Sequence, residues 1–251
     1  PKLLQLSGIG DPDRLREHGV ETRVEAPEVG RNLQDHLDFI LMYASPREEL
    51  LGLSARGILD LAAGAARWMR TGEGVGATSY AEVGAFLNSR PGLARPDLQL
   101  HFVVGIVEDH SRKRHWRKGF SAHVCVLRPR SRGEVRLASA DPRAAPLIDP
   151  AYLSDAEDLE TLHRGAVRLR RILEAPPLDA WRGEEIHTAG VSDADLRGEI
   201  VKRADTIYHP VGTCRMGGDA GAPLDPRLRL RGVAGLRVAD ASVMPTVPAA
   251  N

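Results

Sequence analysis

A histidine set between an aromatic residue and a proline is the side chain best placed to do chemistry in this sequence. It is His209, within residues 208–217, which read YHPVGTCRMG. Proline fixes its own φ and restricts the residue before it, so this segment holds the imidazole in place. An imidazole titrates near neutral pH and can accept a substrate proton. Taken alone, the residues favour a structural hydrogen-bonding role for His209 over a catalytic one.

Two further polar groups follow His209 towards the end of the chain. Residues 235–245 read GLRVADASVMP and predict a short buried strand running into a polar turn made by Asp240, Ala241 and Ser242. Such a turn can contact a ligand where a strand ends, or it can cap the helix that follows. The last residues are PAAN, which place an amide at Asn251. Because an amide takes no proton at neutral pH, the role of base falls to His209.

The first forty residues carry two more candidate segments. Residues 1–10 read PKLLQLSGIG and precede a two-turn helix that Asp11 should cap and Gly19 should end. The glycine-rich turn before that helix can offer amide donors to an anion or serve as a connector, and the sequence leaves both open. Residues 29–36 read VGRNLQDH, a polar loop that contains Asn32 and His36.

The elements between these segments predict a mixed α/β (α+β) fold. Apolar runs at residues 98–104, 121–127 and 134–137 indicate strands of an antiparallel sheet covered on one face, with a turn at residues 131–133 between the last two. One-sided apolar stripes predict helices over residues 54–70, 154–173 and 192–204. The glycine run at residues 72–76 follows a helix and contains a glutamate, so it is read as a loop and not as a dinucleotide fingerprint.

Composition excludes several classes of protein. Basic and acidic residues balance at 34 each, which argues against a nucleic-acid or anionic-membrane surface. Cys125 and Cys214 lack the spacing of a disulfide framework or metal site, and both are expected to be reduced. The nine histidines show no His-x-x-x-His grouping, so no metal site is expected. No apolar stretch reaches bilayer length and no secretion signal is evident, so a cytoplasmic location is expected.

Four of these segments, in this order, resemble motifs of the glucose-methanol-choline (GMC) family of FAD-dependent oxidoreductases. They are the opening ten residues, the loop at residues 29–36, the His209 segment and the stretch from Asp240 to Asn251. The segments LRPRSRG at residues 127–133 and DPAYL at residues 149–153 follow the same family order. The resemblance covers almost the whole chain and is nearest to the choline- and alcohol-dehydrogenase-like branch.

The resemblance implies roles for particular residues. His209 would be the active-site base, with Asn251 beside it facing the flavin. Asp240, Ala241 and Ser242 would contact the flavin's ribityl and diphosphate region, and Asn32 and His36 would contact FAD or support residues that do.

The resemblance also implies a domain arrangement. Part of a Rossmann-like FAD domain, at residues 1–38 and 206–251, would be interleaved with a substrate domain at residues 39–205. The chain would be the carboxyl-terminal part of a larger enzyme that lacks its amino-terminal FAD-binding segment, and would be inactive alone.

The reaction implied is oxidation of a primary alcohol to an aldehyde, with the proton passing to His209 and hydride to the flavin N5. The substrate would be a small alcohol, and the electron acceptor stays unassigned. Two alternatives stay open at this point. One is a hydroxynitrile-lyase-like GMC member, and the other is an inactive truncated fragment or a noncatalytic binding module.

Overall fold

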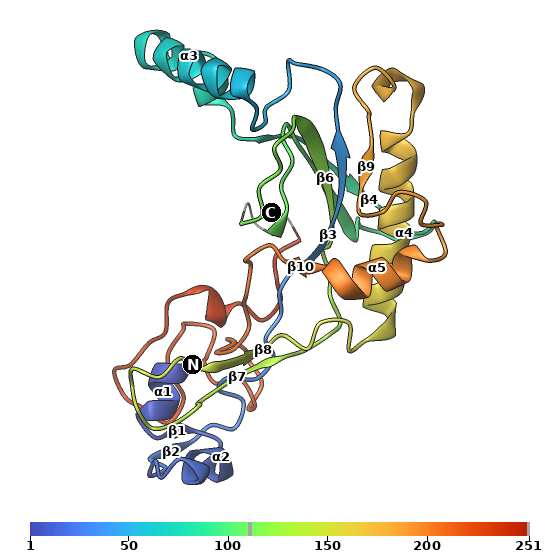
Figure 1. Cartoon of the computed structure of the whole chain (residues 1–251). Coiled ribbons are helices and arrows are strands. Elements are labelled where there is room, and N and C mark those ends of the chain that lie inside the picture. The colour runs from blue at the N-terminus through green and yellow to red at the C-terminus, as the bar shows by residue number, and fades with distance from the viewer. Residues whose placement is uncertain (110–111, 250–251) are drawn as a thin grey trace. The chain divides into compact units, whose positions relative to one another are not determined.

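The computed structural model describes residues 1–109 and 112–249, which divide into two compact units. Unit 1 combines Pro1–Leu37, Leu127–Asp158 and the chain from Thr206 onward, and unit 2 combines Asp38–Val126 with Leu159–Asp205. The fold is mixed α/β with an antiparallel sheet, as the sequence predicts (Figure 1). Each unit is therefore assembled from segments far apart in the sequence.

Unit 2 is built on an antiparallel sheet with the strand order β10-β3-β6-β5-β4, in which β9 also pairs with β3. The strands are β3 (Leu37–Ala44), β4 (Ala81–Leu87), β5 (Leu98–Val103), β6 (Gly119–Val126), β9 (Glu185–Ile186) and β10 (Asp205–Thr206). The central strands are almost wholly buried; in β6 only His123 is partly exposed. This burial explains their near-continuous apolar sequences.

Helix α4 (Ala156–Leu173) covers one face of this sheet (Figure 1). Gly165 allows the close approach, because a Cβ at this position would lie 2.7 Å from Val124 and 2.9 Å from Leu98. Asp155 accepts a hydrogen bond from the N–H of Glu157 at the start of the helix. Helix α5 (Leu196–Arg203) lies within the predicted residues 192–204 and begins after the turn in which Ser192 and Asp195 exchange hydrogen bonds.

The described part of unit 2 also contains helix α3 (Ala55–Thr71) and the short 3₁₀ turns η1 (Val75–Ala77) and η3 (Pro176–Leu178). Ser54 caps α3 by accepting the N–H of Gly57, and Gly72 ends it with a left-handed φ of 72°. The predicted helix and the break after it are both confirmed.

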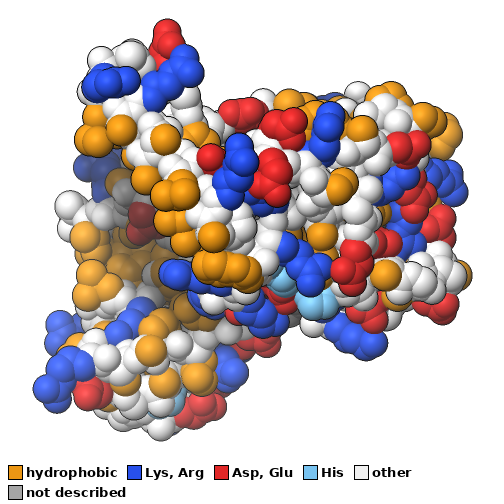
Figure 2. Space-filling view, turned by 45° about the horizontal axis from the view of Figure 1, so that its top comes forward, with side chains coloured by type: hydrophobic (Ala, Val, Ile, Leu, Met, Phe, Trp, Pro, Cys, Tyr) orange, Lys and Arg blue, Asp and Glu red, His pale blue; other side chains and the backbone are white. Residues whose placement is uncertain are grey.

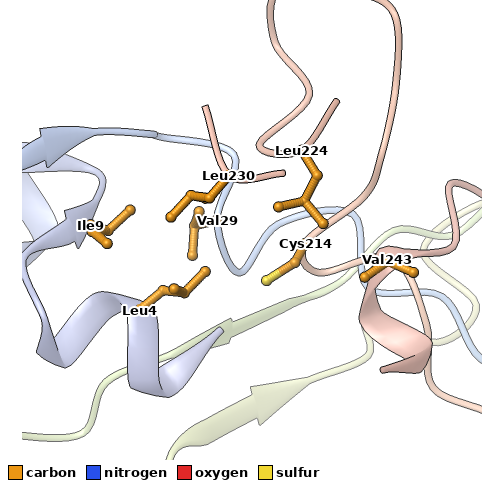
Figure 3. Packing of buried hydrophobic residues seen from close by; sticks show 7 residues of the cluster. All are labelled: Leu4, Ile9, Val29, Cys214, Leu224, Leu230 and Val243. Atoms are coloured by element: carbon orange, nitrogen blue, oxygen red, sulfur yellow. The ribbon is translucent and has the colours of Figure 1, made fainter. Parts of the chain in front are cut away.

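Unit 1 contains short elements around a small apolar core. They are α1 (Lys2–Leu6), β1 (Ile9–Gly10), α2 (Pro12–Glu17), β2 (Val24–Glu25), β7 (Glu134–Arg136), β8 (Leu147–Asp149) and η4 (Ala241–Val243). Asp11 caps α2 as predicted. Figure 3 shows the core, which joins Leu4, Ile9 and Val29 to Cys214, Leu224, Leu230 and Val243 from the other end of the chain. Packing of these residues holds the two ends of the sequence together.

Two predicted local elements are wrong. The turn at residues 131–133 does not join a hairpin, because β6 pairs with β5 whereas β7 pairs with β8. Residues 235–239 are largely exposed and form only an isolated bridge between Arg229 and Arg237. A buried strand needs neighbours to cover its faces and edges, and the described residues supply only that bridge. The glycine turn at Gly8 leads into strand β1, which pairs in parallel with β2.

The compact units also differ from the expected domains in one segment. Residues 39–205 were expected to form a single domain, yet Leu127–Asp158 packs with the terminal segments in unit 1. This segment contains β7, and Gly133 exchanges backbone hydrogen bonds with Leu33. The functions assigned to the domains stay predictions.

On the face shown in Figure 2, basic and acidic side chains are interspersed and do not gather by sign. In the described part of the chain both cysteines are free and buried, and burial raises the pKa of the Cys125 thiol. None of the helices over the described residues is both long and apolar enough to cross a membrane.

Candidate active site

The polar loop at residues 29–36 and the His209 segment lie side by side in unit 1. Gln34 and Val211 exchange backbone hydrogen bonds of 3.0 and 2.9 Å, and the N–H of Gly30 donates to the carbonyl of Thr213 at 2.8 Å. These bonds form a short ladder between segments about 180 positions apart. The ladder sets which side chains of the two motifs face each other.

His36 and His209 meet at the end of this ladder. Their Nδ1 atoms lie 3.1 Å apart and their rings are nearly perpendicular, with an interplanar angle of 88°. One Nδ1 must donate and the other accept, because two lone pairs or two protons cannot share this contact. If His209 donates, its Nε2 carries the lone pair and is the atom able to take a proton. In that arrangement, the contact with His36 places the basic nitrogen of His209 at Nε2.

Asp35 fixes the backbone of the same segment. Its carboxylate is 7% exposed, and Oδ1 accepts the backbone N–H of His209 at 2.8 Å. Oδ2 accepts the hydroxyl of Tyr152 at 2.5 Å and also that of Thr206. A buried carboxylate is tolerated only when hydrogen bonds compensate its lost hydration, and these three donors do so.

Asp35 and Tyr152 were missed as site residues, although both lie in segments already singled out. The available signal was an acidic residue next to His36 just before the largely apolar strand β3, since a buried carboxylate requires partners. The backbone beside His209 is also unusual. Tyr208 has a left-handed φ of 67°, a conformation that costs a non-glycine residue roughly 1–2 kcal/mol. The bonds to Asp35 help hold this conformation.

Asn32 and Gln34 connect the loop to the end of the chain. The amide of Asn32 donates to the carbonyls of Gly212 and Pro245, at 3.3 and 3.4 Å. Gln34 donates to the Pro245 carbonyl at 3.0 Å and accepts the N–H of Val247 at 3.4 Å. These contacts place residues 245–247 beside the His209 segment. Gln34 was not predicted as a site residue.

The turn at Asp240, Ala241 and Ser242 lies against the same segment. The N–H of Cys214 donates to the carbonyl of Ser242 at 2.9 Å. Asp240 caps η4 by accepting the N–H of Ser242 at 2.8 Å, which is the capping role considered from the sequence. Asp240 and Ala241 are exposed, whereas Ser242 is buried. Asn251 lies outside the described residues, so its distance from His209 is not tested.

Comparisons with known proteins bear on this arrangement. Residues 129–251 match the family described as GMC oxidoreductase. The whole chain is 43% identical to alcohol dehydrogenase [acceptor] of Pseudomonas putida and covers 46% of that protein. It is 40% identical to oxygen-dependent choline dehydrogenase of Ectopseudomonas mendocina and covers 45% of it.

Solved structures agree with the sequence comparisons. Pyridoxine 4-oxidase from Mesorbium loti superposes with a TM-score of 0.82 at 29% identity, over 99% of this chain and 45% of its own. Formate oxidase of Aspergillus oryzae superposes with a TM-score of 0.88 at 25% identity, over 100% of this chain and 49% of its own. Residues 129–251 therefore match the GMC oxidoreductase family, and the whole chain is similar to the relatives named above. It spans less than half the length of these GMC relatives, so the activity of a whole protein is a proposal below.

FAD is the cofactor of GMC oxidoreductases, and the polar groups of this chain can be tested against it. The buried Oγ of Ser242 has no hydrogen-bond partner among the described residues. An unpaired buried hydroxyl costs about 1–3 kcal/mol unless a ligand or water satisfies it. With the exposed carboxylate of Asp240, this hydroxyl forms a donor and acceptor set that suits the hydroxyl groups of a ribityl chain. The hydrogen-bonding groups of the turn at residues 240–242 are therefore of the kinds that an FAD ribityl chain can bind.

Proposed function

We propose that this chain is the carboxyl-terminal part of an FAD-dependent enzyme that oxidises a primary alcohol to an aldehyde. The observation that carries the proposal is the contact between Nδ1 of His36 and Nδ1 of His209; with His209 as the donor, its Nε2 can act as the base. The family match supports the reaction class, because the relatives include an alcohol dehydrogenase and a choline dehydrogenase.

In this proposal His36 and Asp35 prepare His209 for proton transfer. His36 accepts the Nδ1 proton and so directs the lone pair at Nε2 towards the substrate hydroxyl. The Asp35 carboxylate holds the backbone of His209 and so keeps the imidazole in position. A positioned base of this kind contributes about 10²- to 10⁴-fold to the rate.

The cofactor and the second hydrogen-bonding group complete the proposal. Asp240, Ala241 and Ser242 would hold the ribityl region of FAD, with Asn32 and His36 supporting the segment next to it. FAD, when bound, supplies hydride acceptance at N5. Asn251 would share the substrate hydroxyl with His209 by hydrogen bonding and would take no proton.

We further propose that the complete enzyme joins this chain to a preceding nucleotide-binding segment, as its relatives' lengths suggest. The adenine and diphosphate contacts would come chiefly from that segment. The electron acceptor is left unassigned, since the relatives' names include both "[acceptor]" and "oxygen-dependent".

The proposal is tested by mixing the complete enzyme with a primary alcohol without oxygen. The flavin absorption band should bleach as hydride is transferred. A matched tertiary alcohol has no hydrogen on the carbinol carbon and should leave the band unchanged. Equal responses to the two alcohols, or no bleaching with any small primary alcohol, would contradict alcohol oxidation.

A further inference from the structure

Three potential metal ligands converge in unit 2. They are Glu108 in the loop after β5, His115 in the loop before β6, and His187 directly after β9. Oε2 of Glu108 lies 2.6 Å from Nε2 of His115 and 3.0 Å from Nε2 of His187. One ligand atom from each of the three residues lies within 4.8 Å of the other two.

We propose that Glu108, His115 and His187 form a binding site for a divalent transition-metal ion such as Zn²⁺. Two imidazole nitrogens and one carboxylate oxygen are ligands that Zn²⁺, Ni²⁺ and Cu²⁺ accept, and a three-ligand set leaves a position for water. Bonds to zinc are about 2.0–2.2 Å long, so two ligand atoms on one ion lie at most about 4.4 Å apart. The observed spacing therefore needs only small side-chain adjustments around an ion.

The surroundings of the three side chains suit an ion that exchanges with solvent. Glu108 and His115 are mostly buried, at 13% and 19% exposure, whereas His187 is 40% exposed. His115 also lines a cavity of about 590 Å³ within unit 2. Partial burial strengthens the attraction between a cation and the carboxylate, while the exposed side provides an entry path.

The Glu108 carboxylate presents one oxygen to both histidines. Its Oε2 lies 2.6 Å from Nε2 of His115 and 3.0 Å from Nε2 of His187. Lys113 contacts the other carboxylate oxygen, Oε1, at 3.1 Å and is 65% exposed, so it can move away from an incoming cation. Oε2 is the oxygen that both histidines approach.

The backbone also brings His187 to this cluster against its local preference. His187 has a left-handed φ of 71°, which is uncommon for a residue other than glycine. A bound ion would tie the end of β9 to the loop that carries Glu108 and His115. Without an ion, the N–H groups of His115 and His187 could both donate to Oε2 of Glu108 and hold the same three residues together. The experiment below distinguishes this hydrogen-bonded cluster from a metal site.

The test measures binding of Zn²⁺ to the whole 251-residue chain after treatment with a chelator. Calorimetric titration at neutral pH should show one ion bound per chain. His115→Ala and His187→Ala should each weaken binding at least about 100-fold, since loss of supporting residues outside the ligand set already costs 10- to 100-fold. His18→Ala removes a histidine at the end of α2 and is the matched control, with unchanged binding expected.

Co²⁺ provides a second measurement on the unaltered chain, which does not depend on the variants folding. Its visible spectrum should show coordination by imidazole nitrogen and carboxylate oxygen, and Glu108→Gln should change that spectrum. Circular dichroism checks that each variant is folded. Undiminished Zn²⁺ binding by folded His115 and His187 variants, loss of binding in His209→Ala, or no binding by the unaltered chain would each overturn the proposal. The outcome is independent of flavin binding and of alcohol oxidation.

Discussion

Replacing Asp35 by Asn tests whether a buried charge organises the His209 segment. The change keeps the size of the side chain and one carbonyl oxygen, so the N–H of His209 can still be accepted. In the parent, the carboxylate accepts hydrogen bonds from the hydroxyls of both Tyr152 and Thr206. The NH₂ group of Asn cannot accept these two hydrogen bonds. Hydrogen bonds to a charged group contribute about 1.5–3 kcal/mol each, against 0.5–1.5 for neutral pairs.

Three bonds are weakened by about 1 kcal/mol each, and the lower desolvation cost of a neutral side chain offsets part of this loss. We therefore expect Asp35→Asn to lower the free energy of unfolding by about 2 kcal/mol. For a chain of this length that corresponds to a fall in melting temperature of roughly 4–8 °C. In the complete enzyme, flavin reduction should also slow by at least about tenfold, because the base loses both its fixed position and a nearby negative charge.

The assay compares thermal unfolding of Asp35→Asn with that of Asp149→Asn. Asp149 is exposed and accepts one backbone N–H, from Ala151 at 2.8 Å, so its replacement changes the formal charge equally but breaks no buried network. Asp149→Asn should lie within about 0.5 kcal/mol of the parent. If both variants melt together, or if Asp35→Asn reduces flavin at the parental rate, the reasoning about Asp35 is refuted.

Three further predictions follow from named contacts. Tyr152→Phe removes one donor to the buried Asp35 and should lower the free energy of unfolding by about 1–2 kcal/mol in urea melts, whereas exposed Tyr80→Phe should have no effect. His36→Gln should leave FAD bound but slow flavin reduction about tenfold or more and shift its pH profile, because the imidazole that sets the tautomer of His209 is gone. An unchanged pH profile would show that His36 does not set this tautomer. The Arg215 guanidinium holds the pKa of Asp219 at about 2, below its usual 3.8. Since the folded-state pKa is lowered, the stability this pair adds is present above pH 3.8 and lost as the pH falls through about 2. The parent and Asp219→Asn should therefore converge in acid melts, and a constant gap would contradict this.

Local signals in the sequence predicted the helices well. Asp11 before a proline and Ser54 before an amphipathic run are caps whose hydrogen bonds involve near neighbours, and each begins a helix as expected. The partners of strands were harder to predict. Strand β7 forms where the sequence predicts it but pairs with β8 and not with β6, and residues 235–239 form only an isolated bridge in the described part of the chain.

The candidate site was predictable to the extent that motifs marked its parts. His36 and His209 were both named, but their contact depends on a ladder between segments about 180 positions apart, which the spacing of residues does not show. Asp35 was not predicted as a site residue. Its buried carboxylate accepts three hydrogen bonds, and the three donors come from distant parts of the sequence. The cluster at Glu108, His115 and His187 was not predicted, because Glu108 and His115 share the loop between β5 and β6 whereas His187 follows β9, far along the sequence.

The most direct test of the proposed function is anaerobic stopped-flow reduction of the flavin in the complete enzyme carrying His209→Ala. With a saturating primary alcohol, the flavin should stay bound and its reduction should slow by about 10²- to 10⁴-fold, the usual contribution of one general base. Bound flavin reduced at the parental rate would contradict the proposal, and His209 would then be a structural residue.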